Sequence, residues 1–233
     1  MRPGLRDSMI VLPRLYAIVD SSAGDSTRDL LAYAEELAAA GVTLIQYRNK
    51  SGNARVILEH ARELRRRFPA HPKIANSAIL EWGTHSSESN NSVRLIMNDR
   101  ADLCLAAEFD GVHVGQDDLS PESVRSIIGP DRWLGVSTHN PEQVREADLT
   151  SADYLAIGPV FSTSSKDKPD PVVGLEGVRR ARQLTRKPLV AIGGITRANA
   201  ASVIDAGADS VAVISDLLRA PRKSAEEFFR ILR

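Results

Sequence analysis

Short apolar runs alternate with longer stretches of helical periodicity along most of this chain. The pattern is plainest near the carboxyl end, where an apolar run over 189–192 is stopped by two glycines. Such a run is typical of a strand buried on both faces. Helical spacing follows Thr196, the expected N-cap, and ends at Gly207 before a second, β-branched run over 210–214. The pattern predicts a β-loop-α-β unit with parallel strands and a right-handed crossover.

Eight such runs occur, and a helical segment follows each of them. This order predicts the α/β class and a (β/α)8 TIM barrel, for which a chain of 233 residues has a typical length. We expect a single domain over residues 15–233, preceded by an N-terminal extension over residues 1–14. The predicted strands span 15–19, 43–47, 94–97, 111–114, 133–137, 153–157, 189–192 and 210–214.

Two helices and one insertion carry further expectations. The helix over 53–68 has four arginines that are expected to form a solvated face, and the last helix is expected over 224–232. A polar insertion at about 69–93 lies between a helix and the next strand, so it should sit at the amino ends of the strands, away from catalysis. The four arginines are Arg62, Arg65, Arg66 and Arg67.

Composition narrows the class of protein. Lys plus Arg and Asp plus Glu both total 30, so the net charge is zero and binding to nucleic acid is not expected. The single cysteine, Cys104, cannot form an internal disulfide, which favours a reducing compartment. No run is apolar for long enough to cross a bilayer, and the apolar part of the N-terminus is short for a signal peptide. We expect a cytoplasmic protein with small-molecule partners and no membrane partner, with a homo-oligomer left open.

Three long polar side chains leave the second predicted strand on alternate residues. Gln46, Arg48 and Lys50 therefore share one face. An unpaired buried cation is very costly, so this face should meet something polar. The pattern favours an anion site over the alternative of a solvated strand end.

Carboxylates end two consecutive strands. Asp99 follows the third strand, and Asp117 and Asp118 follow the fourth. Neighbouring strands lie about 4.8 Å apart, so carboxylates from both could reach one hard cation such as Mg²⁺. The alternative is that Asp117 or Asp118 caps the helix opened by Ser120. We assign Asp118 to the metal and expect Asp117 to face solvent.

The last two strands end in residues suited to an anion. Gly194 lets backbone N–H groups approach a phosphate, and Ser215 ends the next strand at the same height, although a tight turn and a cap would look the same. The hydroxyl-rich loop over 162–171 carries two lysines and could close over a phosphate or be a plain surface loop. Of the histidines, His113 is expected to pack in the core, and His139 is either a helix-starting residue or a general base.

Seven motifs together resemble the thiamin phosphate synthase family, and the likeness runs from about residue 15 to residue 218. They all fall at the carboxyl ends of predicted strands and occur in the family's order. The motifs are QYRNK at 46–50, NDR at 98–100, GVHVGQDD at 111–118, GVSTH at 135–139, GPVFSTSSK at 158–166, GGI at 193–195 and VIS at 213–215.

The resemblance implies a Mg²⁺-dependent joining of 4-amino-2-methyl-5-(diphosphooxymethyl)pyrimidine to hydroxyethylthiazole phosphate, with release of pyrophosphate. It implies a dissociative reaction, in which preplaced cations stabilise the charge that grows on the leaving group. Asp99 and Asp118 would hold Mg²⁺, and the residues implied in catalysis are Arg48, Lys50, Ser137 and Lys166. The pyrimidine diphosphate would contact Gln46, Tyr47, Arg48, Asn49, Lys50, Asn98, Ser137 and Lys166. The thiazole phosphate would contact Thr163, Ser164, Ser165, Gly194, Ile214 and Ser215.

The chain departs from the family pattern at two places, and two other functions stay open. Ser165 stands where the family usually has threonine, which keeps the hydroxyl, and the insertion at 69–93 is not part of the usual pattern. A thiazole tautomerase-like barrel would share the phosphate site but would not need the diphosphate and metal residues; His139 keeps this alternative open. A non-catalytic protein that binds a phosphate ligand is the second alternative.

Overall fold

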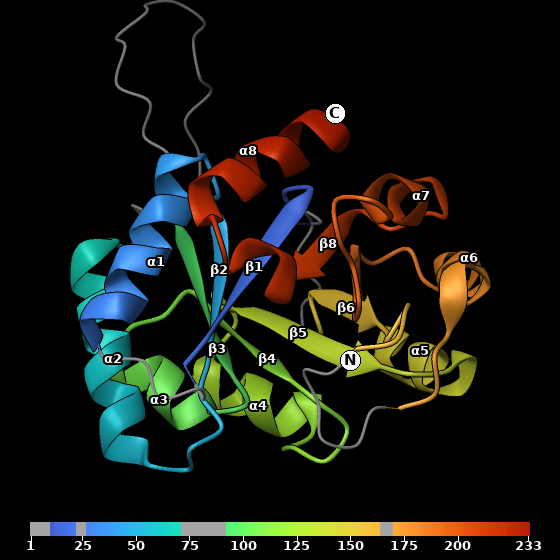
Figure 1. The fold of residues 1–233 in the computed structure, drawn as a ribbon. Helices are drawn as coiled ribbons and strands as arrows, with labels where there is room; N and C mark the ends of the chain where they lie inside the picture. Colours follow the sequence, from blue (N-terminus) through green and yellow to red (C-terminus); the bar gives the residue numbers. More distant parts are fainter. Residues whose placement is uncertain (1–9, 22–26, 71–91, 164–169) are drawn as a thin grey trace, which may run out of the picture.

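Eight parallel strands close into a barrel that is wrapped by helices in the computed structural model of the protein (Figure 1). The structure describes residues 10–21, 27–70, 92–163 and 170–233. Each strand pairs with the next along the chain, and β8 returns to pair with β1. The predicted α/β class and the (β/α)8 barrel are therefore confirmed. The strands are β1 Leu15–Asp20, β2 Leu44–Arg48, β3 Arg94–Asn98, β4 Gly111–Val114, β5 Trp133–Thr138, β6 Tyr154–Ile157, β7 Leu189–Ile192 and β8 Ser210–Val213.

The helices follow the strands in regular order. Asn53, Ser120 and Asn140 cap three of them by accepting hydrogen bonds from backbone N–H groups of the first turn. Within the described residues, no helix combines the length and the apolar character that a membrane span needs. The helices are α1 Thr27–Ala39, α2 Ala54–Arg67, α3 Ala101–Ala106, α4 Pro121–Ile128, α5 Pro141–Asp148, α6 Gly174–Leu184, α7 Ala200–Asp205, the short 3-10 helix η1 Ser215–Leu217 and α8 Pro221–Ile231.

Two predicted helix starts are wrong. Helix α7 begins at Ala200 and not after Thr196, because the backbone from Thr196 to Asn199 forms a turn closed by a 2.8 Å bond from Thr196 N–H to Asn199 Oδ1. Helix α8 begins three residues before the predicted position 224, since Pro221 supplies the fixed φ that suits a first helical turn.

The strands bury both faces, so the molecule has two hydrophobic cores. Consecutive residues of β2 show the division, since Leu44 packs inside the barrel and Ile45 packs under the surrounding helices. Ile96 and Trp133 share the inner core with Leu44. Such layers of large side chains fill the barrel at the amino ends of its strands and leave only its other end open.

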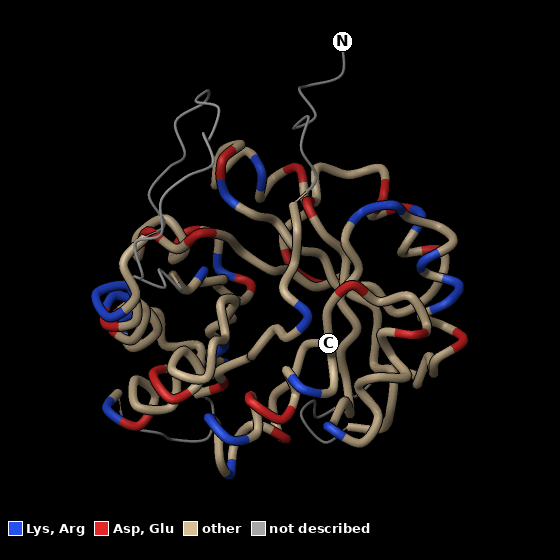
Figure 2. The backbone as a smooth tube through the Cα atoms, turned by 90° about the horizontal axis from the view of Figure 1, so that it is seen from above, with Lys and Arg blue, Asp and Glu red and all other residues tan. Residues whose placement is uncertain are grey.

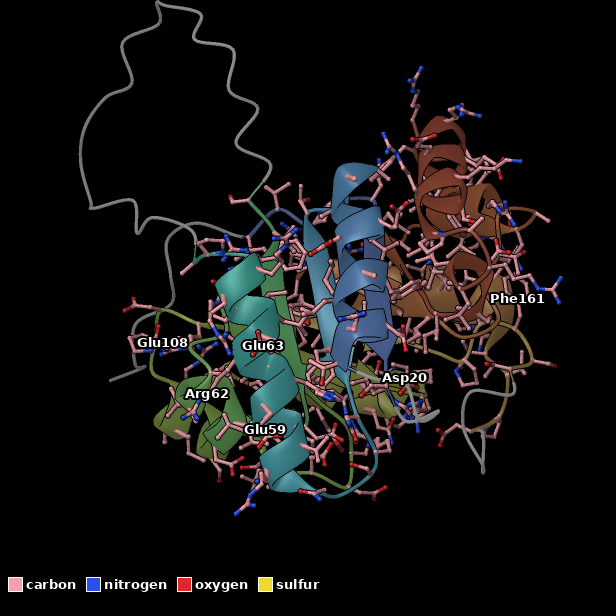
Figure 3. The ribbon with its side chains drawn as sticks, turned by 60° about the vertical axis from the view of Figure 1, so that its left-hand side comes forward. Asp20, Glu59, Arg62, Glu63, Glu108 and Phe161 are labelled. Atoms are coloured by element: carbon pink, nitrogen blue, oxygen red, sulfur yellow. The ribbon has the colours of Figure 1, made fainter. Side chains whose placement is uncertain are left out.

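Arg65 is not part of a solvated face, which corrects one expectation. Arg62, Arg66 and Arg67 are exposed, and Figure 3 shows Arg62 on α2 with Glu59 and Glu63. The Arg65 side chain is only 10% exposed and lies 2.9 Å from Asp110, which also accepts a 2.7 Å bond from Leu95 N–H. Three of the four arginines are therefore solvent-exposed as expected, and the fourth, Arg65, is buried against Asp110.

This arginine–aspartate arrangement recurs around the barrel. In each case an even-numbered helix supplies the arginine, and the residue just before an even-numbered strand supplies the aspartate, which also binds a backbone N–H of the preceding strand. The arrangement ties neighbouring strands together at their amino ends, the end of the barrel opposite the cavity, where contacts serve stability and not chemistry. The three sets are Arg65, Asp110 and Leu95; Arg125, Asp153 and Leu134; and Arg182, Asp209 and Leu189.

Among the described residues, charged side chains of both signs are mixed over the outside of the barrel. Lys and Arg alternate with Asp and Glu around the periphery when the tube is seen from above (Figure 2). The neutral net charge of the sequence therefore reflects local mixing of both signs.

Candidate active site

A cavity of about 480 Å³ opens at the carboxyl ends of the strands. Every strand of the barrel, or the loop after it, contributes to its wall. This is the end of a (β/α)8 barrel at which catalysis takes place. Of the residues predicted for the site, the structure brings together Gln46, Arg48, Lys50, Asn98, Asp99, Asp118, Ser137, Thr163, Gly194, Ile214 and Ser215.

Two residues predicted to contact the substrate lie outside the cavity. Tyr47 is fully buried on the outer face of β2, with its hydroxyl 2.9 Å from Nδ1 of His60 on α2. Asn49 turns to the same side, where its Nδ2 donates to the Tyr47 hydroxyl at 3.2 Å. Strand alternation sends both side chains away from Gln46 and Arg48. We leave Tyr47 and Asn49 out of the proposed substrate site.

Three further predicted residues, Ser164, Ser165 and Lys166, lie outside the described residues, as does Lys168. Their roles stay predictions from the sequence. The structure describes the loop after β6 as far as Thr163, which lines the cavity, and again from Asp170, which also lines it.

Asp99 and Asp118 form an acidic pair at the mouth of the cavity. Burial raises the pKa of Asp118, the negative charge of Asp99 raises it further, and Lys50 lowers it. Lys50 Nζ lies 2.5 Å from Asp99 Oδ2, so one ammonium group faces the pair. Asp117 is exposed, as expected, but Asp118 is exposed as well and both line the cavity, so exposure does not separate them.

The backbone fixes both members of the acidic pair. Asp99 has a φ of 62°, in the left-handed region that aspartate tolerates better than most residues. Its N–H donates to the carbonyl oxygen of His113 at 2.8 Å. Asp118 Oδ2 accepts a 2.8 Å bond from Gly115 N–H. Strand β4 and its loop therefore hold the carboxylate from β3 beside their own.

The donor set at this pair suits a small hard cation. Carboxylate oxygens are the ligands that Mg²⁺ takes from proteins, and it commonly uses one or two of them with water and substrate phosphate oxygens. Among the described residues, no cluster of three or more His, Cys, Asp or Glu side chains forms an all-protein metal cage. Two close carboxylates whose mutual repulsion already raises one pKa would be relieved by a divalent ion.

Arg48 supplies a second cation, held in place by Asp20. The two side chains form an ion pair across the paired ends of β1 and β2, and they are 17% and 15% exposed. Asp20 was not singled out from the sequence; it ends β1, and Figure 3 shows where it lies. A partly buried arginine with a carboxylate partner keeps its direction, so its guanidinium is presented to the cavity in a defined orientation.

Gly193 and Gly194 allow two loops to meet at the other side of the cavity. Their φ angles are 97° and 64°, which glycine adopts without strain. A Cβ at Gly193 would lie 2.5 Å from Cβ of Pro159, and one at Gly194 would lie 2.5 Å from the carbonyl oxygen of Ser162. The glycines thus bring the end of β7 against the loop after β6, beside Ser215.

His139 lines the cavity with a fixed ring. Its Nδ1 lies 2.6 Å from the carbonyl oxygen of Gly158, so Nδ1 carries the proton of that hydrogen bond. Its Nε2 lies 3.5 Å from Asp170 Oδ2, and its backbone N–H donates to Gln143 Oε1 at 2.7 Å. The residue is therefore anchored at the start of α5 and also faces the cavity.

Polar side chains inside the barrel form a continuous chain beneath the cavity. Gln46 Nε2 lies 2.8 Å from the Tyr16 hydroxyl, which lies 3.1 Å from the Tyr154 hydroxyl. The chain continues over 3.2 Å to His113 Nδ1, and His113 Nε2 lies 2.9 Å from Ser137 Oγ. Burial raises the pKa of both tyrosines and lowers that of His113 to about 4.

Sequence reasoning treated His113 only as a core residue, and its burial confirms that expectation. It missed Tyr16 and Tyr154 altogether. The signal was present in the first strand, where Tyr16 and Ile18 alternate on one face in the same way as Gln46 and Arg48 on the second. Pairing of the two strands then decides which hydroxyl meets which amide.

Comparison with known proteins identifies the relatives of this chain. The thiamine monophosphate synthase family model matches residues 15–73 and 84–217, so residues 74–83 fall between the two matched stretches. A thiamine-phosphate synthase of Koribacter versatilis is 57% identical over 228 residues, covering 97% of this chain and 98% of the relative. One of Chloroflexus aurantiacus is 41% identical over 209 residues, covering 89% and 86%.

A solved structure agrees with these relatives. Thiamine phosphate pyrophosphorylase from Pyrococcus furiosus superposes with a TM-score of 0.74 at 31% identity, covering 94% of this chain and 95% of that one. A 3-hexulose-6-phosphate synthase with a TM-score of 0.66 is only 16% identical, so that likeness shows the fold alone.

Proposed function

The chain belongs to the thiamine monophosphate synthase family, and we propose that its cavity joins 4-amino-2-methyl-5-(diphosphooxymethyl)pyrimidine to hydroxyethylthiazole phosphate. The products are thiamin monophosphate and pyrophosphate, so the enzyme is a transferase of thiamine biosynthesis. The observation that carries the site-level proposal is the charge arrangement at the cavity mouth. Arg48 ends β2 and Lys50 lies in the loop after it, while the acidic pair of Asp99 and Asp118 lies in the loops after β3 and β4.

A diphosphate and a divalent ion fit this arrangement together. Asp99 and Asp118 would hold Mg²⁺, with diphosphate and water oxygens as its remaining ligands. When bound there, the ion neutralises charge on the diphosphate oxygens. Lys50, already 2.5 Å from Asp99 Oδ2, can turn its other N–H groups to the same diphosphate.

The protein's cations act on the leaving group. In the proposed reaction the bond between the pyrimidine methylene carbon and the diphosphate oxygen breaks, and its electron pair leaves with pyrophosphate. Charge on that oxygen grows toward the transition state, so Arg48 and Lys50 stabilise the transition state more than the bound substrate. Lys166 would add a third cation, as the resemblance implies, but it lies outside the described residues.

The second half of the reaction needs the thiazole to be correctly positioned and needs no general base. The lone pair of the thiazole nitrogen forms the new bond to the methylene carbon, and that nitrogen has no proton to lose. The thiazole phosphate would be held where Gly194, Ser215 and Thr163 meet, and Ile214 would pack against its apolar part. A phosphate site after the last two strands is a recurrent feature of this fold.

The charges also separate the proposal from its alternatives. A tautomerase-like barrel moves protons on one heterocycle and releases no pyrophosphate, so the acidic pair and Lys50 would have no task. A protein that only binds a phosphate ligand would need neither a metal pair nor room for two substrates. His139 faces the cavity and could transfer protons, so the tautomerase-like alternative is still worth testing.

The experiment is a coupling assay with purified full-length protein, both heterocyclic phosphates, and Mg²⁺ present or replaced by a chelator. We expect thiamin monophosphate and pyrophosphate in equal amounts, and only with Mg²⁺. Asp118→Asn serves as the matched variant, since it keeps the size of the side chain and removes its charge. Binding of both substrates without coupled product in the presence of Mg²⁺ would refute the proposal.

A further inference from the structure

The buried chain of polar groups beneath the cavity has a single direction. Gln46 Nε2 can only donate, so the Tyr16 oxygen accepts and the Tyr16 proton is directed to the Tyr154 oxygen. Among the described residues, the Tyr154 hydroxyl has one further partner, His113 Nδ1, and it must donate there. A ring nitrogen that accepts carries no proton, so the imidazole proton lies on the other nitrogen.

That proton decides the role of Ser137. Nε2–H of His113 donates to Ser137 Oγ over 2.9 Å, which occupies an acceptor position of the serine oxygen. The Ser137 hydroxyl proton is then left for the cavity, whose wall Ser137 forms. Each of the four contacts in the chain then pairs one donor with one acceptor, as buried polar groups require.

The barrel makes space for this chain at one glycine. A Cβ at Gly135 would lie 2.2 Å from Tyr154 Cζ and 2.4 Å from both the Tyr154 hydroxyl and His113 Nδ1. Gly135 lies two residues before Ser137 on β5, on the same inward face. The Tyr154–His113 hydrogen bond therefore occupies the space that a side chain at position 135 would need, and only glycine leaves that space free.

We propose that Tyr16, Tyr154 and His113 are positioning residues that hold the Ser137 hydroxyl as a hydrogen-bond donor to an acceptor atom of the bound substrate. The direction of the chain follows from the Gln46 amide donating at one end and from one donor meeting one acceptor at each further contact; only the use of the donor rests on the proposed function. Under that function the acceptor is a diphosphate oxygen or a pyrimidine ring nitrogen. A ligand without an acceptor at this point would leave the Ser137 hydroxyl proton unpaired and would bind less tightly.

The first test reads the proton directly and needs no activity. Nitrogen-15 NMR of the full-length protein with labelled histidine distinguishes the two neutral tautomers, and His113→Asn identifies the signal among the five histidines. We expect the Nε2–H tautomer for His113. The Nδ1–H tautomer would reverse the whole chain, make Ser137 a donor to His113, and overturn the proposal.

The second test asks whether the chain acts through Ser137. Tyr154→Phe keeps the ring and removes the hydroxyl that donates to His113 Nδ1. We expect kcat to fall about 10-fold, as is usual when the partner of a functional group is lost, with little change in KM for the thiazole phosphate. Ser137→Ala should lower kcat by about 10²-fold, as for loss of one transition-state donor.

The double variant separates positioning from general loss of structure. If Tyr154 acts through Ser137, Tyr154→Phe should lower kcat no further in the Ser137→Ala background. Tyr33→Phe is the control, since it removes a buried hydroxyl on α1, outside the barrel, and should leave kcat unchanged. Additive losses would overturn the positioning role. If neither the wild type nor any variant couples the substrates, the proposed function fails. The NMR result still decides the direction of the hydrogen-bond chain.

Discussion

Lys50 Nζ lies 2.5 Å from Asp99 Oδ2, although 49 residues separate them in the chain. Strands β2 and β3 pair side by side, so the loops after them begin at the same height. One cation thus faces one carboxylate of the acidic pair before any ligand is present. Binding of Mg²⁺ and a diphosphate would exchange this ion pair for two new ones, which makes the pair a preformed part of the site.

Asp99 and Asp118 should act as one metal site. We expect Asp118→Asn to raise the Mg²⁺ concentration needed for half-maximal activity by at least 10-fold. Adding Asp99→Asn should then change it little, because the second change acts on a site already lost. The measurement is turnover against Mg²⁺ concentration for both single variants and the double variant. Fully additive losses would show that the two carboxylates do not share an ion.

Lys50 should stabilise the departing pyrophosphate. Lys50→Gln is expected to lower kcat by about 10² to 10³, the usual cost of one lost electrostatic contact to a transition state. Lys50→Arg, which keeps the charge, should recover most of this. The KM for the thiazole phosphate should stay the same in both variants. A raised KM for the pyrimidine diphosphate with unchanged kcat would mean that Lys50 only binds the substrate.

Gly135→Ala should destabilise the folded protein by about 1–3 kcal/mol, because the new methyl group overlaps the Tyr154–His113 contact. Urea unfolding at neutral pH measures this. Gly52→Ala is the control: it imposes the strain of a φ of 75° but meets no atom within 4 Å. A cost near zero at Gly135 would indicate that the barrel interior yields to the methyl group.

His113 should make stability depend on pH. Burial lowers its pKa to about 4 from 6.5, so below pH 6.5 the unfolded chain binds a proton that the folded chain does not bind until about pH 4. The free energy of unfolding should therefore fall across this window by about 3 kcal/mol on account of His113, at about 1.4 kcal/mol per tenfold change in proton affinity. His113→Gln lacks this contribution. Urea unfolding of both proteins from pH 8 to pH 4 should show their stability difference shrinking; a constant difference would contradict the expectation.

Residues 74–83, which fall between the stretches that match the family, should be dispensable for chemistry. They lie outside the described residues; their place in the chain between α2 and β3 predicts that they sit at the amino ends of the strands, opposite the cavity. Deleting them should leave coupling activity within about 3-fold of the full chain. A folded deletion variant without activity would show that this segment contributes to the site or to an essential interface.

The order of the fold and much of the site were predictable from the sequence. Eight apolar runs punctuated by glycine, proline and capping residues give eight strands, because each strand is buried on both faces and each helix must turn back across the sheet. The residues that end those strands then necessarily gather at one end of the barrel. For that reason Gln46, Arg48, Asp99 and Asp118 line one cavity as expected.

Contacts between strands and helices could not be predicted in the same way. A run of arginines on a helix looks solvated until the partner of one of them, Asp110, is brought to it by a strand 45 residues further along. The QYRNK motif at 46–50, interpreted from the sequence as one substrate-binding unit, has side chains on both faces of β2, since Tyr47 points outward and Gln46 inward.

The sequence by itself determined that polar side chains would face into this barrel; only the tertiary structure decided how they hydrogen-bond. Tyr16, Tyr154 and His113 come from three different strands, and the distances of 3.1 and 3.2 Å that join them exist only once the barrel has closed. Alternation along a strand fixes which face a residue takes. It carries no information about which residue lies across the barrel, because that depends on the stagger and tilt of all eight strands.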